Sequence, residues 1–138
     1  MPHVKAATGS SADALRERTE RLRRDRSAAR VLRVMFPALQ ELRLELRFKD
    51  GDSSAPAFQL HIMHPPARAF FRFPCPHADC SGQFDLTEAV TDACADPTRR
   101  SEGVLICSGV RPRTYDSKQP CALQLAYGVI AKEYAAGG

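Results

Sequence analysis

Apolar and charged residues alternate strictly over residues 41–49, with an apolar side chain at every even position. A period of two is typical of a β-strand that buries one face. A turn-forming sequence follows at residues 50–54, and the same alternation resumes with Phe58, Leu60 and Ile62. Residues 41–63 are therefore predicted to form a β-hairpin, with these three side chains on its apolar face and with Gln59 and His61 on its polar face.

Further strand-like segments follow this hairpin, at residues 68–73, 81–86 and 102–106, and a short helix is expected between Thr87 and Cys94. Residues 121–134 fit two periods: alternating apolar residues favour a strand, whereas a second apolar stripe fits a helix. Gly128 disfavours the helix, so a strand is preferred. The predicted fold class is mainly β (α+β), an antiparallel β-meander with an N-terminal basic helix and a short inserted helix.

The N-terminal segment has a different pattern. Residues 1–11 are small and polar, and are expected to be disordered. Residues 12–34 are predicted to form a helix with a thin apolar stripe, so that only its last two turns dock on a core. The expected organisation is a tail and helix at 1–36 followed by a single globular domain at 37–138.

Four of the five cysteines form two pairs, Cys75-x4-Cys80 and Cys107-x13-Cys121, and strand-like sequence flanks each pair. Zn²⁺ takes four ligands in a tetrahedron, and thiolates on two separate loops can supply them. The sequence therefore predicts a Zn²⁺ site with these four ligands. The fifth, Cys94, lies in the short helix and is expected to be buried as a small apolar residue.

The segment from residue 68 to residue 130 resembles the zinc-ribbon class. The resemblance rests on the two cysteine pairs, on Cys75-Pro76, and on a Cys-x-Gly step at Cys80 and again at Cys107. The spacings of four and thirteen residues depart from the usual C-x2-C, and His77 is an alternative ligand. A site without metal, holding only buried thiols, is the other alternative. The resemblance implies a non-enzymatic module for nucleic-acid or protein recognition.

The formal net charge is +4, and the excess of positive charge lies in the N-terminal helix. Clustered arginines can contact nucleic-acid phosphates, although acids spaced i, i+4 also indicate a solvated helix. The expected partner is a nucleic acid or an acidic protein. Candidate partner-binding residues in the helix, around the first cysteine pair and in the long loop between Cys107 and Cys121 are Arg21, Arg23, Arg24, Arg26, Arg30, Phe70, Arg72, Arg111, Arg113 and Lys118.

Several classes of protein are disfavoured. The sequence has no apolar run of about 18 residues and no apolar leader, so no membrane association and a cytoplasmic location are expected. It lacks a phosphate-binding glycine loop and the H-x-E and P-C-x-x-C motifs of zinc deaminases. An enzyme would require an open metal position, and it remains the alternative to a binding module.

Overall fold

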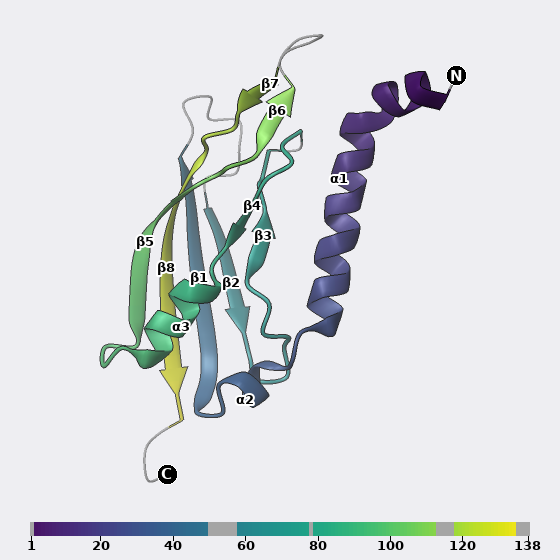
Figure 1. Cartoon of the computed structure of the whole chain (residues 1–138). Coiled ribbons are helices and arrows are strands. Elements are labelled where there is room, and N and C mark those ends of the chain that lie inside the picture. The colour runs from purple at the N-terminus through teal and green to yellow at the C-terminus, as the bar shows by residue number, and fades with distance from the viewer. Residues whose placement is uncertain (1, 50–57, 78, 113–117, 135–138) are drawn as a thin grey trace.

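The computed structural model describes residues 2–49, 58–77, 79–112 and 118–134 (Figure 1). The predicted turn at 50–54 and Arg113 lie outside the described residues. The elements are α1 (Pro2–Ala28), α2 (Leu32–Met35), β1 (Leu39–Lys49), β2 (Phe58–Met63), β3 (Arg72–Pro74), β4 (Gln83–Asp85), α3 (Thr87–Ala95), β5 (Arg100–Ile106), β6 (Val110–Pro112), β7 (Lys118–Pro120) and β8 (Gln124–Glu133).

A four-stranded antiparallel sheet in the order β2-β1-β8-β5 forms the body of the molecule. The mainly β class and the strand at β8 are confirmed. The predicted meander is wrong, because the C-terminal strand β8 inserts between β1 and β5. The short strands β3 and β4 form a separate hairpin, as do β6 and β7.

The alternation in β1 sets the two faces of the sheet. Leu42, Leu44 and Leu46 are fully buried and face the layer that contains α3 and the β3–β4 hairpin. The prediction for β2 was wrong: Phe58, Leu60 and Ile62 are exposed on the open face. The register explains the reversal, since Leu44 lies opposite His61 and Glu45 opposite Leu60, so His61 shares the covered face.

The core fills the space between the covered face and the layer above it. Phe84 packs against Phe48, with ring centroids 5.8 Å apart, and Leu32 from α2 is fully buried. The short helix predicted at 87–94 is confirmed as α3, which buries Ala89, Val90 and Ala93. Cys94 is half-buried against this core, and burial raises the pKa of its thiol.

Helix α1 differs from the prediction at both ends. It extends back to Pro2 through residues expected to be disordered; proline suits the first helical turn, and no other proline interrupts the segment. It stops at Ala28 because Arg30 and Val31 run beside Arg68, in a bridge that also includes the hydrogen bond from Ala69 N to Arg30 O. This bridge also explains why the strand predicted at 68–73 is shortened to β3.

Helix α1 lies alongside the β3–β4 hairpin (Figure 1). Its contacts begin well before its last two turns, since Leu22 is 6% exposed and Arg18 bonds to the β3–β4 loop. The expectation that only its C-terminal end docks is therefore wrong. Among the described residues, no helix combines the length and apolarity that crossing a membrane requires.

Candidate metal centre

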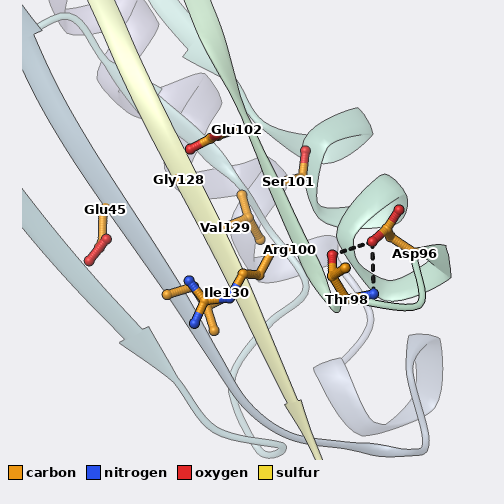
Figure 2. A pocket seen from close by; sticks show the side chains of 9 residues that line it. All are labelled: Glu45, Asp96, Thr98, Arg100, Ser101, Glu102, Gly128, Val129 and Ile130. Atoms are coloured by element: carbon orange, nitrogen blue, oxygen red, sulfur yellow. Dashed lines mark hydrogen bonds between the residues drawn. The ribbon is translucent and has the colours of Figure 1, made fainter.

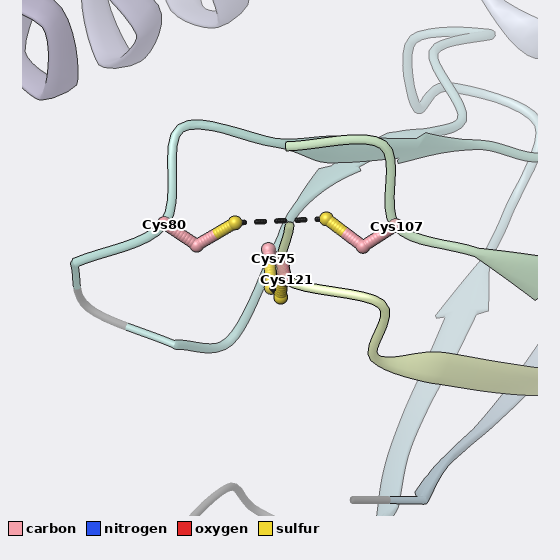
Figure 3. A group of neighbouring side chains, drawn as sticks. All are labelled: Cys75, Cys80, Cys107 and Cys121. Atoms are coloured by element: carbon pink, nitrogen blue, oxygen red, sulfur yellow. Dashed lines mark hydrogen bonds between the residues drawn. The ribbon is translucent and has the colours of Figure 1, made fainter. Parts of the chain in front are cut away.

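The four predicted cysteine ligands come together at one end of the molecule. Cys75 and Cys80 lie in the loop between β3 and β4, and Cys107 and Cys121 flank the β6–β7 hairpin. In Figure 3, Cys80 and Cys107 point toward each other, and Cys75 lies beside Cys121. All four sulfur atoms lie within 4.8 Å of one another, and three of the four residues are buried.

The sulfur separations fit a tetrahedral metal ion. Cys80 Sγ lies 3.6 Å from Cys107 Sγ, and Cys75 Sγ lies 3.7 Å from Cys121 Sγ. Zn–S bonds of about 2.3 Å in a regular tetrahedron place sulfurs roughly 3.8 Å apart. A disulfide would require about 2.05 Å. The group can therefore hold a metal ion, and its sulfurs are too far apart to be disulfide-bonded.

The two loops repeat one hydrogen-bonding pattern. Gly82 N donates to Cys80 Sγ at 3.3 Å, and Gly109 N donates to Cys107 Sγ at 3.4 Å. Each donor lies two residues after its cysteine, as the repeated Cys-x-Gly step allows. Amide donors of this kind stabilise negative charge on sulfur and orient it toward a metal ion. The pattern fits metal thiolates.

The same glycines let the loops approach closely. A Cβ atom on Gly82 would lie 2.3 Å from Cys107 Sγ, and one on Gly109 would lie 2.4 Å from Gly82 N. No side chain fits at either position without displacing the opposite loop. The sequence placed these glycines beside the cysteines, but their contact across the two loops required the structure.

The sulfur group is poorly solvated. Burial, together with neighbouring thiols, raises the pKa of Cys75 and raises that of Cys107 to about 12, although the Gly109 amide opposes the shift at Cys107. Such thiols ionise at neutral pH only when a cation compensates their charge. A soft divalent ion such as Zn²⁺ suits this donor set.

His77, the alternative ligand, is buried at 5% exposure and is not part of the sulfur cluster. Asp79 in the first cysteine loop and Arg111 in the β6–β7 hairpin link the two loops. Arg111 Nε donates to Asp79 Oδ1 at 2.7 Å, and this bond lowers the pKa of Asp79. Arg111 was expected to contact a partner, but its side chain is 15% exposed and bonded to the opposite loop.

Helix α1 supplies a contact that sequence reasoning missed. Arg18 Nη1 donates to the carbonyl oxygens of Cys80 and Gly82, the latter at 2.8 Å. These two oxygens belong to the first cysteine loop, so the helix is fixed directly to the candidate metal centre. The i, i+4 pattern of the helix gave no sign of it, because the contact spans more than 60 residues of sequence.

The predicted stacking platform is not exposed. Phe70 is 8% exposed, and the guanidinium groups of Arg26 and Arg72 lie over its ring at 5.1 and 4.9 Å from its centroid. Arg72 also forms an ion pair with Asp25. These contacts fasten α1 to the hairpin and cover the ring of Phe70.

Other predicted arginines are exposed. These are Arg21, Arg23 and Arg24 on α1 and Arg30 just after it, and Arg23 is paired with Glu20. Lys118 begins β7, and its side chain, like Arg113, lies outside what the structure describes. The structure thus places Arg26, Arg72 and Arg111 in contacts within the chain and leaves an exposed set on and just after α1.

A hollow without cysteines in its lining is formed by residues of β1, β5, β8 and the connection between α3 and β5 (Figure 2). Its volume is about 530 Å³, and both Glu and Arg side chains line it. The Asp96 carboxylate accepts hydrogen bonds from Thr98 N and Oγ1 and shapes a turn. Neither cysteine nor histidine lines this hollow, so it offers no thiolate or imidazole ligand for a metal ion.

The chain matches no protein-family model, no curated protein and no solved structure. The metal-compatible geometry of Cys75, Cys80, Cys107 and Cys121 is therefore the firmest functional feature of this chain.

Proposed function

We propose that this chain is a zinc-dependent recognition module in which Cys75, Cys80, Cys107 and Cys121 bind one structural Zn²⁺ ion. The observation that carries the proposal is the sulfur cluster, with its two symmetric N–H donors from Gly82 and Gly109. Four thiolates complete a tetrahedron and leave no position for water. Such a closed site supports folding rather than a reaction.

Nucleic acid is the partner that the charge distribution favours. Arg21 and Arg24 are exposed, lie three residues apart and therefore share a face of α1. Within the described part of the chain, neither forms an ion pair with a carboxylate. Guanidinium groups without acidic partners suit phosphate oxygens. Arg18 fixes the helix to the metal centre, so the metal would hold the basic surface in place.

The metal part of the proposal is tested by zinc content and by the absorption spectrum of a cobalt-substituted sample. One equivalent of metal and a four-thiolate tetrahedral spectrum are expected, and Cys80→Ser should abolish both. A spectrum that shows a water ligand would contradict the closed site and favour a metal-dependent enzyme.

The partner is tested by titrating single-stranded and duplex oligonucleotides at increasing salt. Binding should weaken steeply with salt, and the double variant Arg21→Ala and Arg24→Ala should lower the affinity about tenfold or more and flatten the salt dependence. Arg16→Ala is the matched control, since Arg16 is exposed on the same helix but paired with Asp13. Affinity for an acidic protein that the same double variant weakens, without affinity for oligonucleotides, would instead favour an adaptor that uses α1 on that protein.

A further inference from the structure

A groove runs along β2, the outer strand of the four-stranded sheet. Its volume is about 670 Å³, and it is lined by the consecutive β2 residues 59–63. These residues alternate between the covered face, where His61 lies, and the open face, where Leu60 lies. Because side chains of both faces line the groove, the groove lies at the edge of the strand. In Figure 1 this edge lies beside β3.

The backbone of β2 is available at this edge. Within the described part of the chain, β2 pairs only with β1, and none of residues 58–63 takes part in a backbone hydrogen bond outside that ladder. An edge strand with free N–H and C=O groups is a template for another strand. The sheet can therefore accept a fifth strand on this side.

The edge also lacks the features that prevent strand addition. The six residues of β2 include no proline and no Lys, Arg, Asp or Glu, and the β1–β2 register is continuous. The opposite edge strand, β5, carries Arg100, Glu102 and Gly103. Charges on an edge strand oppose pairing with another chain. The two edges thus differ, and β2 is the permissive one.

The walls of the groove define what fits there. Phe73, Met63 and Phe70 supply apolar surface, and Arg26 supplies positive charge. Asp25 neutralises Arg72, whereas no described carboxylate pairs with Arg26. Burial and the charge of Arg26 lower the pKa of His61, which keeps its imidazole neutral. The groove therefore combines apolar side chains with the polar side chains of Gln59 and His61 and with one cation, Arg26, that has no described carboxylate partner.

We propose that β2 is a docking edge for an extended peptide of alternating apolar and acidic residues, which adds as a fifth strand with a carboxylate on Arg26. Main-chain hydrogen bonds would provide affinity, and the apolar wall would select alternate side chains. A second copy of this chain is a poorer occupant, because it would bring two arginine-rich α1 helices together. This surface is separate from the exposed arginines proposed to contact nucleic acid.

The test uses the full zinc-loaded chain and an acetylated, amidated peptide that alternates valine and glutamate. Saturable binding is expected, with amide chemical-shift changes concentrated in residues 58–63. Leu60→Glu should weaken binding about tenfold or more, since a charge on the edge repels the peptide. Val104→Glu is the matched control, because Val104 is an exposed apolar residue on the other edge strand. A peptide methylated on alternate backbone nitrogens should not bind.

Several results would overturn the proposal. They are no saturable binding, equal effects of Leu60→Glu and Val104→Glu, undiminished binding of the methylated peptide, or pairing of two copies through β2 in the absence of peptide. Displacement of the peptide by an oligonucleotide that shifts the same β2 amides would assign the groove to nucleic acid instead. Loss of oligonucleotide binding in the Arg21 and Arg24 variant, with peptide binding unchanged, keeps this proposal distinct from the previous one.

Discussion

Gly82 and Gly109 touch across the two cysteine loops, and this contact decides how closely the sulfurs approach. An added methyl group at Gly82 would lie 2.3 Å from Cys107 Sγ. Gly82→Ala must therefore push the loops apart and distort the tetrahedral arrangement of the four sulfur atoms. We expect a loss of stability of about 2 kcal/mol, together with at least tenfold weaker zinc binding in a competition assay with a chromophoric chelator.

Gly128 provides the matched control. A Cβ atom at this strand position would meet only the Glu45 side chain, at 3.7 Å or more. Because glycine weakens a strand, Gly128→Ala should leave zinc affinity unchanged and raise the free energy of unfolding by about 0.5 kcal/mol. Equal zinc affinity for the Gly82 and Gly128 variants would show that the loops do not need their close contact.

His61 predicts a pH dependence of stability. Its ring packs on Phe73 with centroids 4.6 Å apart and bonds to Gln59 at 3.0 Å. Burial, and then the charge of Arg26, lowers its pKa below 6.5. The unfolded chain therefore binds more protons just below pH 6.5, so this residue makes stability fall as the pH drops from 6.5 to the folded-state pKa.

Urea unfolding of the zinc-loaded protein at pH 7.5, 6.5 and 5.5 measures this effect. His61→Gln removes the titration but keeps a polar side chain beside Gln59, so its stability should fall less than that of the original chain over the same steps. Parallel curves for the two proteins would mean that His61 does not titrate differently in the folded state.

At the scale of elements, Arg18 is one of several side chains that dock α1, and it is the one bonded to a cysteine loop. Arg18 donates to two carbonyl oxygens of the first cysteine loop. Arg18→Ala leaves both acceptors without this charged donor and should cost about 2 kcal/mol. Hydrogen exchange should accelerate in residues 18–28 and in the β3–β4 loop. Arg21→Ala on the same helix should alter neither, since Arg21 is exposed.

Local pattern predicted individual elements better than their assembly. The strict alternation of residues 41–49 identified β1 and its buried leucines, because a charged face and an apolar face can be arranged in only one way on a half-buried strand. The same argument failed at β2, because its odd-numbered and even-numbered residues are all apolar or uncharged. There the pairing of Leu44 with His61, rather than hydrophobicity, decides which side chains are covered.

The order of the strands in the sheet could not be predicted from local sequence pattern either. The sequence indicated a strand within residues 121–134, but the insertion of β8 between β1 and β5 is a long-range pairing that no short window encodes. The bridge between Val31 and Arg68 likewise ended α1 early, although the local sequence favours a longer helix. Tertiary contacts override propensity in both cases.

At the scale of the whole molecule, the cysteine spacing predicted the four residues of the metal-compatible group because two Cys-x-Gly steps on two hairpins restrict how thiolates can converge. It did not predict that α1 would pack on the first of these loops. A helix rich in arginine looks solvated in sequence, and only the Arg18, Asp25 and Arg26 contacts identify its docked face.

This arrangement predicts that the folding of two regions of the molecule depends on metal to different degrees. Leu42, Leu44 and Leu46 are completely buried and belong to β1, a strand of eleven residues in the four-stranded sheet. The β3–β4 and β6–β7 hairpins beside the cysteines have only three residues in each strand. Such hairpins are not stable alone. Metal would be needed for them and, through Arg18, for the position of α1.

Removal of zinc with a chelator at neutral pH should therefore increase hydrogen exchange first in residues 72–85, 107–123 and 18–28, while β1 and β8 keep most of their protection. Readdition of zinc under reducing conditions should restore the original pattern, because metal binding and folding of the loops are coupled. Uniform loss of protection would mean that the metal supports the sheet as well. An unchanged pattern would mean that the sulfur group is stable as free thiols, and the basic helix would then not depend on the metal for its placement.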